Sequence, residues 1–387
     1  MFYLFIAILL FCFSFLHLNN RALYHRRDYV ICFILFVVIA GFAYQTGVDW
    51  RIYSSVYTFS EPIDRAIIVG SFFEPNSGVI TEPGYALLSS VIKFFTDDFQ
   101  FLMFWTNFIA AIFLLKGFYK YKSNLYLSLL LYLGYIYLTL NMSGIRQAVA
   151  VAIVFYALSF LHSKQYKYYA FWILIAGSFH VSALIMLPAA FMLNRKINDK
   201  LTYLVLGIGL VIYTLRISLI NQFIISFGES FDNPFIMKAY NYSLSANEGN
   251  TFSFKVILNF IMMILFLQCK KKMCDRNEYV SIFLNLFIIH LFVLEYLWDT
   301  GEIVRRLQFY FLLGLIVILP EFLMSLKIRT NKFICLIYIF LLTIWSSNPI
   351  FLSLPNGKPY NPYQNYVIHQ ILNLHSTGEK RLDEFVD

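Results

Sequence analysis

Charged side chains are scarce in this chain. Only 13% of its 387 residues are Asp, Glu, Lys or Arg, whereas 59% are hydrophobic. A water-soluble domain of this length does not carry so much apolar surface. Apolar runs of roughly 16–20 residues, separated by short polar clusters, instead predict an all-α fold, a polytopic transmembrane helical bundle. Because these runs are continuous, they exclude the alternating pattern of a membrane β-barrel.

The sequence also lacks the short motifs of several soluble enzyme classes. It contains no Walker A loop, dinucleotide-binding fingerprint, HExxH sequence or nucleophile elbow, so ATP hydrolysis and serine hydrolase chemistry have no support. Its five cysteines show neither a disulfide framework nor metal-ligand spacing. We therefore expect no cofactor and no metal. The net charge of +8 does not indicate nucleic-acid binding, because the basic residues cluster between apolar runs.

Ten apolar segments are predicted to span the membrane. The first is not preceded by a basic residue, as a cleavable signal peptide would be, so we expect it to stay attached. The segments lie near residues 2–18, 29–44, 99–116, 125–140, 144–161, 201–219, 254–269, 279–297, 307–325 and 333–349.

Segment 169–193 differs from these ten because it is interrupted at Gly177 to His180. Each of its two pieces has about 11–13 residues, too few to span at 1.5 Å per residue. We expect a re-entrant hairpin or a pair of short helices, with His180 at the outward tip. This arrangement keeps six basic loops on one side, which the positive-inside bias places in the cytoplasm. The basic residues of these loops are Arg21, Arg26, Arg27; Lys116, Lys120, Lys122; Lys164, Lys167; Arg195, Lys196, Lys200; Lys270, Lys271, Lys272, Arg276; and Lys327, Arg329, Lys332.

The domain organisation follows from the same pattern. Residues 1–350 are expected to form a single transmembrane helical domain, with loops 45–98 and 220–253 on the extracytoplasmic side. Residues 351–387 are expected to form a polar C-terminal tail on that side, with a short helix near Tyr366 to Leu374.

Arg146 occupies an unusual position. It follows Ser143-Gly144-Ile145 and precedes an apolar run, so it should lie in the first turn of a transmembrane helix. The helix dipole is already positive at that end, which makes a cation unfavourable unless an anion is close. The position therefore predicts a binding site for phosphate or diphosphate at a membrane surface.

Further charged residues are expected at outward-facing helix ends. Arg305 and Arg306 also precede an apolar run. Three arginines facing one compartment suit a diphosphate, because guanidinium stays charged and binds phosphate oxygens through paired donors. A second interpretation stays open, in which these arginines form structural ion pairs with Asp49, Glu82 or Glu302.

Together these motifs resemble the EpsG/Wzy-like family of bacterial membrane polysaccharide polymerases. Each motif is short, but their order and separation extend over roughly residues 40–310. The motifs are Gly47-x-Asp49-Trp50-x-x-Tyr53, Glu82-Pro83-Gly84-Tyr85, Ser143-Gly144-Ile145-Arg146-Gln147-Ala148, Phe179-His180-x-Ser182-Ala183, and Arg305-Arg306 with Tyr310.

The resemblance implies a glycosyltransferase of the general GT-C kind in the bacterial cytoplasmic membrane, with its active site on the extracytoplasmic side. Such an enzyme joins undecaprenyl-diphosphate-linked O-antigen or exopolysaccharide repeat units and consumes no nucleotide sugar. The implied partners are these lipid-linked glycans, membrane lipids, and a chain-length regulator and flippase of the same pathway. Nucleic acid is not among them.

Residue roles follow from this chemistry. Arg146, Arg305 and Arg306 would bind the diphosphate, and Arg146 would stabilise the charge that develops as the glycosidic bond breaks. Asp49 or His180 would take the proton from the acceptor hydroxyl, and the sequence does not rank the two. An imidazole has an unperturbed pKa of roughly 6.5, which suits a base. The residues expected to contact the glycan are Trp50, Tyr53, Glu82 and Gln147.

Other functions remain open at this point. A glycan ligase or a membrane acyltransferase could act on the same glycans, and a flippase or transporter could move lipid-linked sugars. A ligase mutant should accumulate long unattached polymer, whereas an acyltransferase mutant should lose only ester groups. Transporters often place charged residues near the bilayer midplane in paired halves. Here the candidate residues lie at helix ends, and no paired halves are detected.

Overall fold

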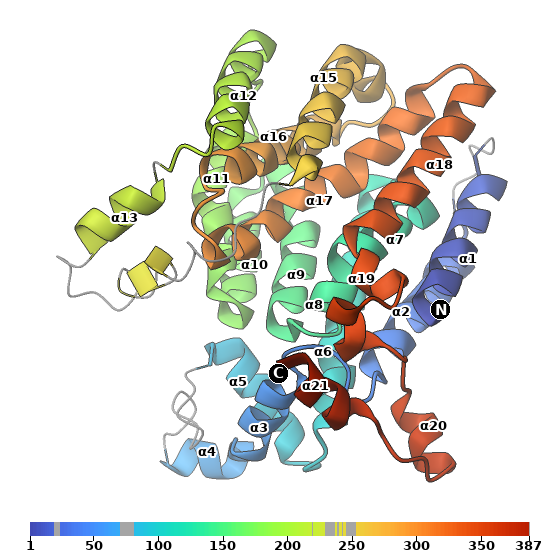
Figure 1. Cartoon of the computed structure of the whole chain (residues 1–387), viewed down its shortest axis with the longest axis vertical. Helices are drawn as coiled ribbons and strands as arrows, with labels where there is room; N and C mark the ends of the chain where they lie inside the picture. Colours follow the sequence, from blue (N-terminus) through green and yellow to red (C-terminus); the bar gives the residue numbers. More distant parts are fainter. Residues whose placement is uncertain are drawn as a thin grey trace. The chain divides into compact units, whose positions relative to one another are not determined.

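The regular secondary structure of this protein is helical, as a computed structural model shows (Figure 1). The structure describes residues 1–18, 24–69, 81–218, 220–228 and 253–386, and within 229–252 only residues 237, 240, 241, 243 and 244. In this part of the chain, one isolated β-bridge between Ala43 and Asn365 is the sole departure from helices and loops. The all-α prediction is therefore confirmed.

The chain forms two compact units, Met1–Leu184 with Leu326–Asp387, and Ile185–Ser325. The first unit contains α1 (Phe2–Leu16), α2 (Arg26–Gly41), α3 (Trp50–Thr58), α4 (Ile63–Val69), α5 (Pro83–Lys93), α6 (Phe99–Tyr121), α7 (Leu125–Tyr132), the π-helical turn η1 (Leu133–Tyr137), α8 (Leu138–Leu140), α9 (Ile145–His162), α10 (Tyr166–Phe179), α18 (Arg329–Ser346), α19 (Asn348–Phe351), the 3-10 helix η4 (Pro355–Tyr360), α20 (Tyr366–Ile371) and α21 (Gly378–Val386). The second unit contains α11 (Met186–Leu193), α12 (Asp199–Thr214), α13 (Ile220–Gly228), α15 (Phe254–Cys274), α16 (Val280–Tyr296) and α17 (Glu302–Ser325).

All ten apolar segments predicted from the sequence coincide with helices, but the number of membrane spans is not confirmed. Among the described residues, three helices are long and apolar enough to cross a membrane, namely α6, α9 and α17. Shorter apolar helices of 10–17 residues lie at Phe2–Leu16, Leu125–Leu140, Val181–Leu193 and Val280–Tyr296. The protein is therefore a helical membrane protein, and the total of about ten spans stays a prediction.

The interruption predicted within segment 169–193 is present. α10 ends at Phe179, and His180 adopts an extended backbone conformation with φ −156° and ψ 115°. A 3-10 helix, η2 (Val181–Ile185), follows and leads into α11. The boundary between the two units lies within η2, between Leu184 and Ile185. The re-entrant hairpin stays a prediction, whereas the break beside His180 is confirmed.

Helix α9 forms the centre of the first unit. It packs against α6 and α10, and almost every side chain from Gln147 to Leu161 is buried. Small Ala and Val side chains on α9 allow this close approach. On the facing helix, Gly117 lies so close to the ring of Phe155 that a Cβ atom would come within 2.5 Å of it. α9 is thus held rigidly, and so is the first turn that carries Arg146.

The basic loops of the first unit gather at one end of its helices. Tyr24 donates a 2.7 Å hydrogen bond to Asn124, which joins the start of α2 to the start of α7. Lys120 near the end of α6 bonds to Ser159 of α9 at 3.1 Å. The chain order then places segments 42–49 and 141–144 at the opposite helix ends. Within the first unit the described basic loops therefore alternate with the other loops, whereas their common side with the basic loops of the second unit stays a prediction and Arg21 lies outside the described residues.

The second unit repeats this separation of loops. At one end, Lys270 forms a 2.7 Å ion pair with Asp199, so two basic loops meet. At the other end, Ser218 donates a 2.6 Å hydrogen bond to Asp299. Helices α12, α15 and α17 all pack against α16. The predicted loop 220–253 falls mostly outside the described residues, apart from α13 and a few positions after it.

The C-terminal segment 355–386 packs against segment 42–51 of the first unit. Backbone hydrogen bonds of 2.8–3.0 Å and the β-bridge join the two segments. Arg51 at the start of α3 forms a 2.7 Å ion pair with Asp383 of α21. Helix α20 confirms the short helix expected near Tyr366. The bonded backbone pairs are Tyr44 with Gln364, Gly47 with Pro359, and Tyr366 with Phe42.

Candidate functional site

The loop after α2 is held against the loop before α9. Gly47 has φ +98°, in the left-handed region that favours glycine, and any Cβ there would collide with the backbone of Met142. This close approach lets the backbone N–H of Asp49 donate to Ser143 Oγ at 3.1 Å. α3 then begins directly after Asp49 and carries Tyr53 one turn later. The Gly47–Asp49–Tyr53 spacing therefore aims Tyr53 toward the first turn of α9.

The sequence Glu82-Pro83-Gly84-Tyr85 starts α5 and brings it close to α10. Glu82 is the extended N-cap residue, and Pro83 at the first helical position has the φ value that a helix start requires. A Cβ on Gly84 would lie 3.0 Å from the carbonyl oxygen of Ser178 and still closer to its hydroxyl. Glycine therefore permits the contact that places Glu82 within reach of the end of α10.

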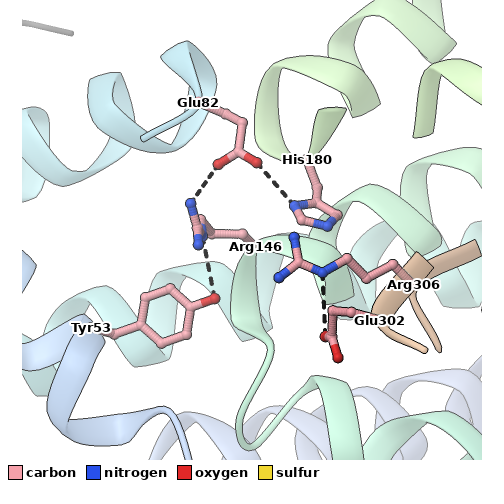
Figure 2. Close-up of polar contacts among 6 residues, drawn as sticks. All are labelled: Tyr53, Glu82, Arg146, His180, Glu302 and Arg306. Carbon is pink, nitrogen blue, oxygen red and sulfur yellow. Dashed lines mark hydrogen bonds and ion pairs between the residues drawn. The ribbon is translucent and has the colours of Figure 1, made fainter. Parts of the chain in front are cut away.

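Arg146 lies in the first turn of α9, as predicted, and an anion is present beside it. Its Nη1 forms a 2.6 Å ion pair with Glu82 Oε2, and its Nε donates a 3.2 Å hydrogen bond to the hydroxyl of Tyr53 (Figure 2). The guanidinium carbon lies 5.2 Å from the ring centre of Tyr53 and 5.7 Å from that of Tyr85. Both distances allow cation–π attraction, which adds to the ion pair.

His180 completes this cluster. Its Nδ1 lies 3.0 Å from Glu82 Oε1, so the two carboxylate oxygens of Glu82 are divided between Arg146 and His180 (Figure 2). The His180 side chain is only 8% exposed. Its Nε2 is buried and has no hydrogen-bond partner among the described residues. We call Tyr53, Glu82, Arg146 and His180 the Arg146 cluster.

The charges of the cluster are tightly balanced. Burial alone would raise the pKa of Glu82, but the hydrogen bond from His180 and the charge of Arg146 outweigh burial and lower this pKa to about 2. Burial raises the pKa of Tyr53, and Arg146 opposes only part of that rise. At neutral pH the cluster therefore holds one guanidinium cation, one carboxylate and a neutral phenol. Such a site can bind an anion if the ion pair between Glu82 and Arg146 weakens.

An apolar, aromatic wall surrounds the cluster. Trp50 packs against this wall, and its indole Nε1 is buried with no hydrogen-bond partner in the described part of the chain. Gln147, the residue after Arg146, is also buried. Low water access strengthens the electrostatic interactions within the cluster. The wall consists of Tyr53, Tyr57, Tyr85, Ile92, Phe99, Leu102, Met103 and Ile145, with Leu88 and Phe179 packed on it.

Asp49 lies outside the hydrogen-bond chain of the cluster. Its backbone N–H is bonded to Ser143, and its side chain is half-buried. The carboxylate makes no hydrogen bond or ion pair with any other residue that the structure describes. The sequence predicted Asp49 and His180 as alternative bases. In the structure His180 is connected to Arg146 because both contact Glu82, whereas Asp49 has no such connection.

Arg305 and Arg306 lie in the first two turns of α17 in the second unit. Both pair with Glu302, at 2.7 Å for Arg305 and 3.4 Å for Arg306. Figure 2 shows the contact between Arg306 and Glu302. The side chains of Arg305 and Arg306 are 71% and 35% exposed. These pairs match the structural interpretation left open by the sequence. Partly exposed i,i+3 and i,i+4 pairs of this kind contribute little to stability.

Sequence reasoning missed the part that Tyr85 and Gly84 play. Tyr85 was quoted as part of a motif, but its cation–π contact with Arg146 was not expected. The signal was its position three residues after Glu82, which places both side chains on the same helix end. Among the described residues, no group of three or more His, Cys, Asp or Glu side chains could hold a metal ion.

A sequence profile of the EpsG family matches residues 28–365, which include every member of the Arg146 cluster. The match confirms the resemblance drawn from the short motifs. No curated protein and no solved structure gives a significant match to the chain.

Proposed function

The chain belongs to the EpsG family, and from this premise we propose that it is a polymerase of lipid-linked glycans. Family membership indicates a polysaccharide polymerase-like role, and the apolar helices indicate a membrane protein. We propose that the enzyme joins undecaprenyl-diphosphate-linked repeat units into a surface polysaccharide. The reaction takes place on the extracytoplasmic side of the bacterial cytoplasmic membrane.

The observation that carries this proposal is the carboxylate of Glu82, which contacts both the guanidinium of Arg146 and the imidazole of His180. A lipid diphosphate is an anionic leaving group, and its negative charge grows as the bond to the anomeric carbon breaks. Arg146 supports this charge from a largely buried helix end, where electrostatic stabilisation is strong. The acceptor hydroxyl forms the new bond to the anomeric carbon, and its proton passes to a nearby base.

The remaining candidate residues take supporting roles in the proposal. Arg305 and Arg306 supply further cations for the diphosphate, since their pairs with Glu302 are partly exposed. Trp50, Tyr53 and Gln147 are proposed to contact the glycan. His180 and Asp49 are the two groups that could accept the hydroxyl proton.

Purified protein, supplied only with lipid-linked repeat units, tests the proposal. The wild-type protein should produce a ladder of longer chains without nucleotide sugar. Arg146→Ala should remain folded and accumulate single units. Arg146→Lys should retain charge but lose the paired donors, which we expect to slow polymerisation by about 10²- to 10³-fold.

Arg51→Ala provides the matched control for this experiment. Arg51 is a cation at the same end of the first unit, but it pairs with Asp383 at the surface. Its removal should leave chain length nearly unchanged. A folded Arg146→Ala protein that still makes long chains at the wild-type rate would contradict the proposal, as would the absence of any ladder with wild-type protein.

A further inference from the structure

Glu82 occupies a position that its expected role as a glycan contact does not explain. One carboxylate oxygen is paired with Arg146 and the other with His180, so neither is directed to a separate ligand. We propose that Glu82 is a positioning residue for the proposed polymerisation. It holds the His180 ring with the proton on Nδ1, which leaves Nε2 as the atom that removes the acceptor hydroxyl proton. This inference rests on the proposed function and selects His180, rather than Asp49, as the base.

The hydrogen-bonding capacities of the two groups determine the tautomer. An ionised carboxylate only accepts hydrogen bonds, so the 3.0 Å contact with Oε1 requires a proton on His180 Nδ1. In a neutral ring, Nε2 then carries the lone pair. This orientation of an imidazole by a carboxylate is the general arrangement of an activated base.

The ionisation of Glu82 is secured by its neighbours. Arg146 and His180 together hold the pKa of the Glu82 carboxyl at about 2, despite burial, which acts in the opposite direction. A carboxylate of such low basicity is a poor proton acceptor. Glu82 therefore directs the ring and does not itself take the proton.

The surroundings of His180 Nε2 point to a missing partner. The atom is buried and has no hydrogen-bond partner among the described residues. Leaving a buried polar atom without a partner costs free energy. An acceptor hydroxyl that donates to Nε2 would remove this cost when the glycan binds. Asp49 has no comparable neighbour that orients its carboxylate.

The proposed step balances in atoms and charge. The acceptor oxygen bonds to the anomeric carbon of the donor, and the bond from that carbon to the diphosphate oxygen breaks. The hydroxyl proton moves to Nε2, so His180 becomes an imidazolium cation. Its Nδ1 proton still faces Glu82, whose charge stabilises the cation. The diphosphate departs with the bonding electron pair, and the proton later passes to water.

A double-mutant cycle tests whether Glu82 acts through His180. We expect Glu82→Ala and His180→Ala each to lower kcat by about 10²- to 10⁴-fold, with a smaller change in KM for the acceptor. The loss in the double variant Glu82→Ala/His180→Ala should be far smaller than the product of the two single losses, because only the effect that Glu82 exerts through Arg146 remains once His180 is absent. Losses that multiply in the double variant would overturn the inference.

A spectroscopic measurement separates positioning from a general effect on folding. In 15N-histidine-labelled protein, the His180 signal, identified by its loss in His180→Gln, should show the Nδ1-protonated tautomer. Glu82→Ala should weaken this preference, and Glu82→Asp should restore part of both the tautomer and the activity. An Nε2-protonated ring in the wild-type protein would refute the inference.

Asp97→Asn is the matched control for removal of a carboxylate. Asp97 belongs to the same extended loop, its side chain is 91% exposed, and its charge is paired with Lys93 at the surface. This variant should keep the wild-type kcat and tautomer.

If the wild-type protein makes no ladder, the proposed function fails. If the ladder forms but the two losses multiply, only the inference fails.

Discussion

At the scale of single residues, the carboxylate of Glu82 compensates the unfavourable positive charge of Arg146. A cation in the first turn of a helix is opposed by the helix dipole. The structure places a carboxylate 2.6 Å from that cation, on a side chain that is only 16% exposed. Breaking a buried pair leaves one charge uncompensated, which costs more than the pair itself contributes. The same carboxylate holds His180, so one substitution disturbs two functional groups.

The pH dependence of stability should reveal the ionised state of Glu82. Its folded-state pKa of about 2 lies below the ordinary value of 4.5, so its contribution to stability is complete above pH 4.5 and is lost as the pH falls toward 2. We expect wild-type protein in detergent to be more stable than Glu82→Gln by about 1–3 kcal/mol at pH 6–8. The difference should shrink at pH 4 and again at pH 3. Thermal unfolding of both proteins across this range measures it, and a difference that grows on acidification would contradict the assignment.

The residues of the Arg146 cluster were all named from the sequence, but their connections were not. Glu82 contacts residues that lie 64 and 98 positions away in the chain, at Arg146 and His180. Motif spacing shows which side chains lie near helix ends, because helices have regular periodicity. It does not show which ends pack together. For the same reason, the sequence could not distinguish Asp49 from His180.

At the scale of helices, the contact between α5 and α10 controls the cluster. Gly84 lies against the backbone of Ser178, only two residues before His180. Backbone atoms cannot move aside as a flexible side chain can, so the separation of the two helices depends on the missing Cβ. This separation fixes the distance from Glu82 to His180.

Gly84→Ala should therefore impair activity through geometry alone. The added methyl group forces α5 away from α10, lengthens the Glu82–His180 contact and lowers stability by about 1–3 kcal/mol. Gly207→Ala in α12 is the matched control, because no atom lies within 4 Å of the position of its Cβ and alanine favours a helix. We expect a lower polymerisation rate and melting temperature for Gly84→Ala, and neither loss for Gly207→Ala. Equal behaviour of the two variants would show that the close approach is unimportant.

Most helices could be predicted from hydrophobic runs, whereas the number that cross the membrane could not. An apolar run indicates a buried helix, but the length of that helix decides whether it spans. α16 has 17 residues and α1 has 15, so each falls short of the roughly 20 that a perpendicular span requires. The π-helical turn η1 further divides the run 125–140. The break at His180 was predictable because Gly177 and Ser178 weaken a helix there.

At the scale of the whole molecule, the basic loops and the motif-bearing loops separate to opposite helix ends in each unit. In the first unit, Tyr24 and Asn124 meet at the basic end. Asp49 and Ser143 meet at the other. The positive-inside bias then predicts that the Arg146 cluster faces away from the cytoplasm.

Thiol labelling in intact cells tests this orientation. In a cysteine-free background, Lys380→Cys lies in α21, which packs at the end that carries Asp49. Lys271→Cys lies near the basic end of α15 in the second unit and is its matched counterpart. A membrane-impermeant reagent should label position 380 and leave position 271 unlabelled until the cells are opened. The reverse pattern would place the cluster in the cytoplasm and exclude a lipid-linked donor on the outer surface.

The contacts between segments 355–386 and 42–51 join parts of the chain that are synthesised at different times. Segment 42–51 is translated before helices α5 to α18 and segment 355–386 after them, yet Gly47 is bonded directly to Pro359. A nascent chain that has inserted these helices but lacks segment 355–386 has no partner for the turn before Asp49. Catalytic competence would then be acquired only after segment 355–386 has docked, so molecules without this segment would stay inert toward the precursor sugars around them.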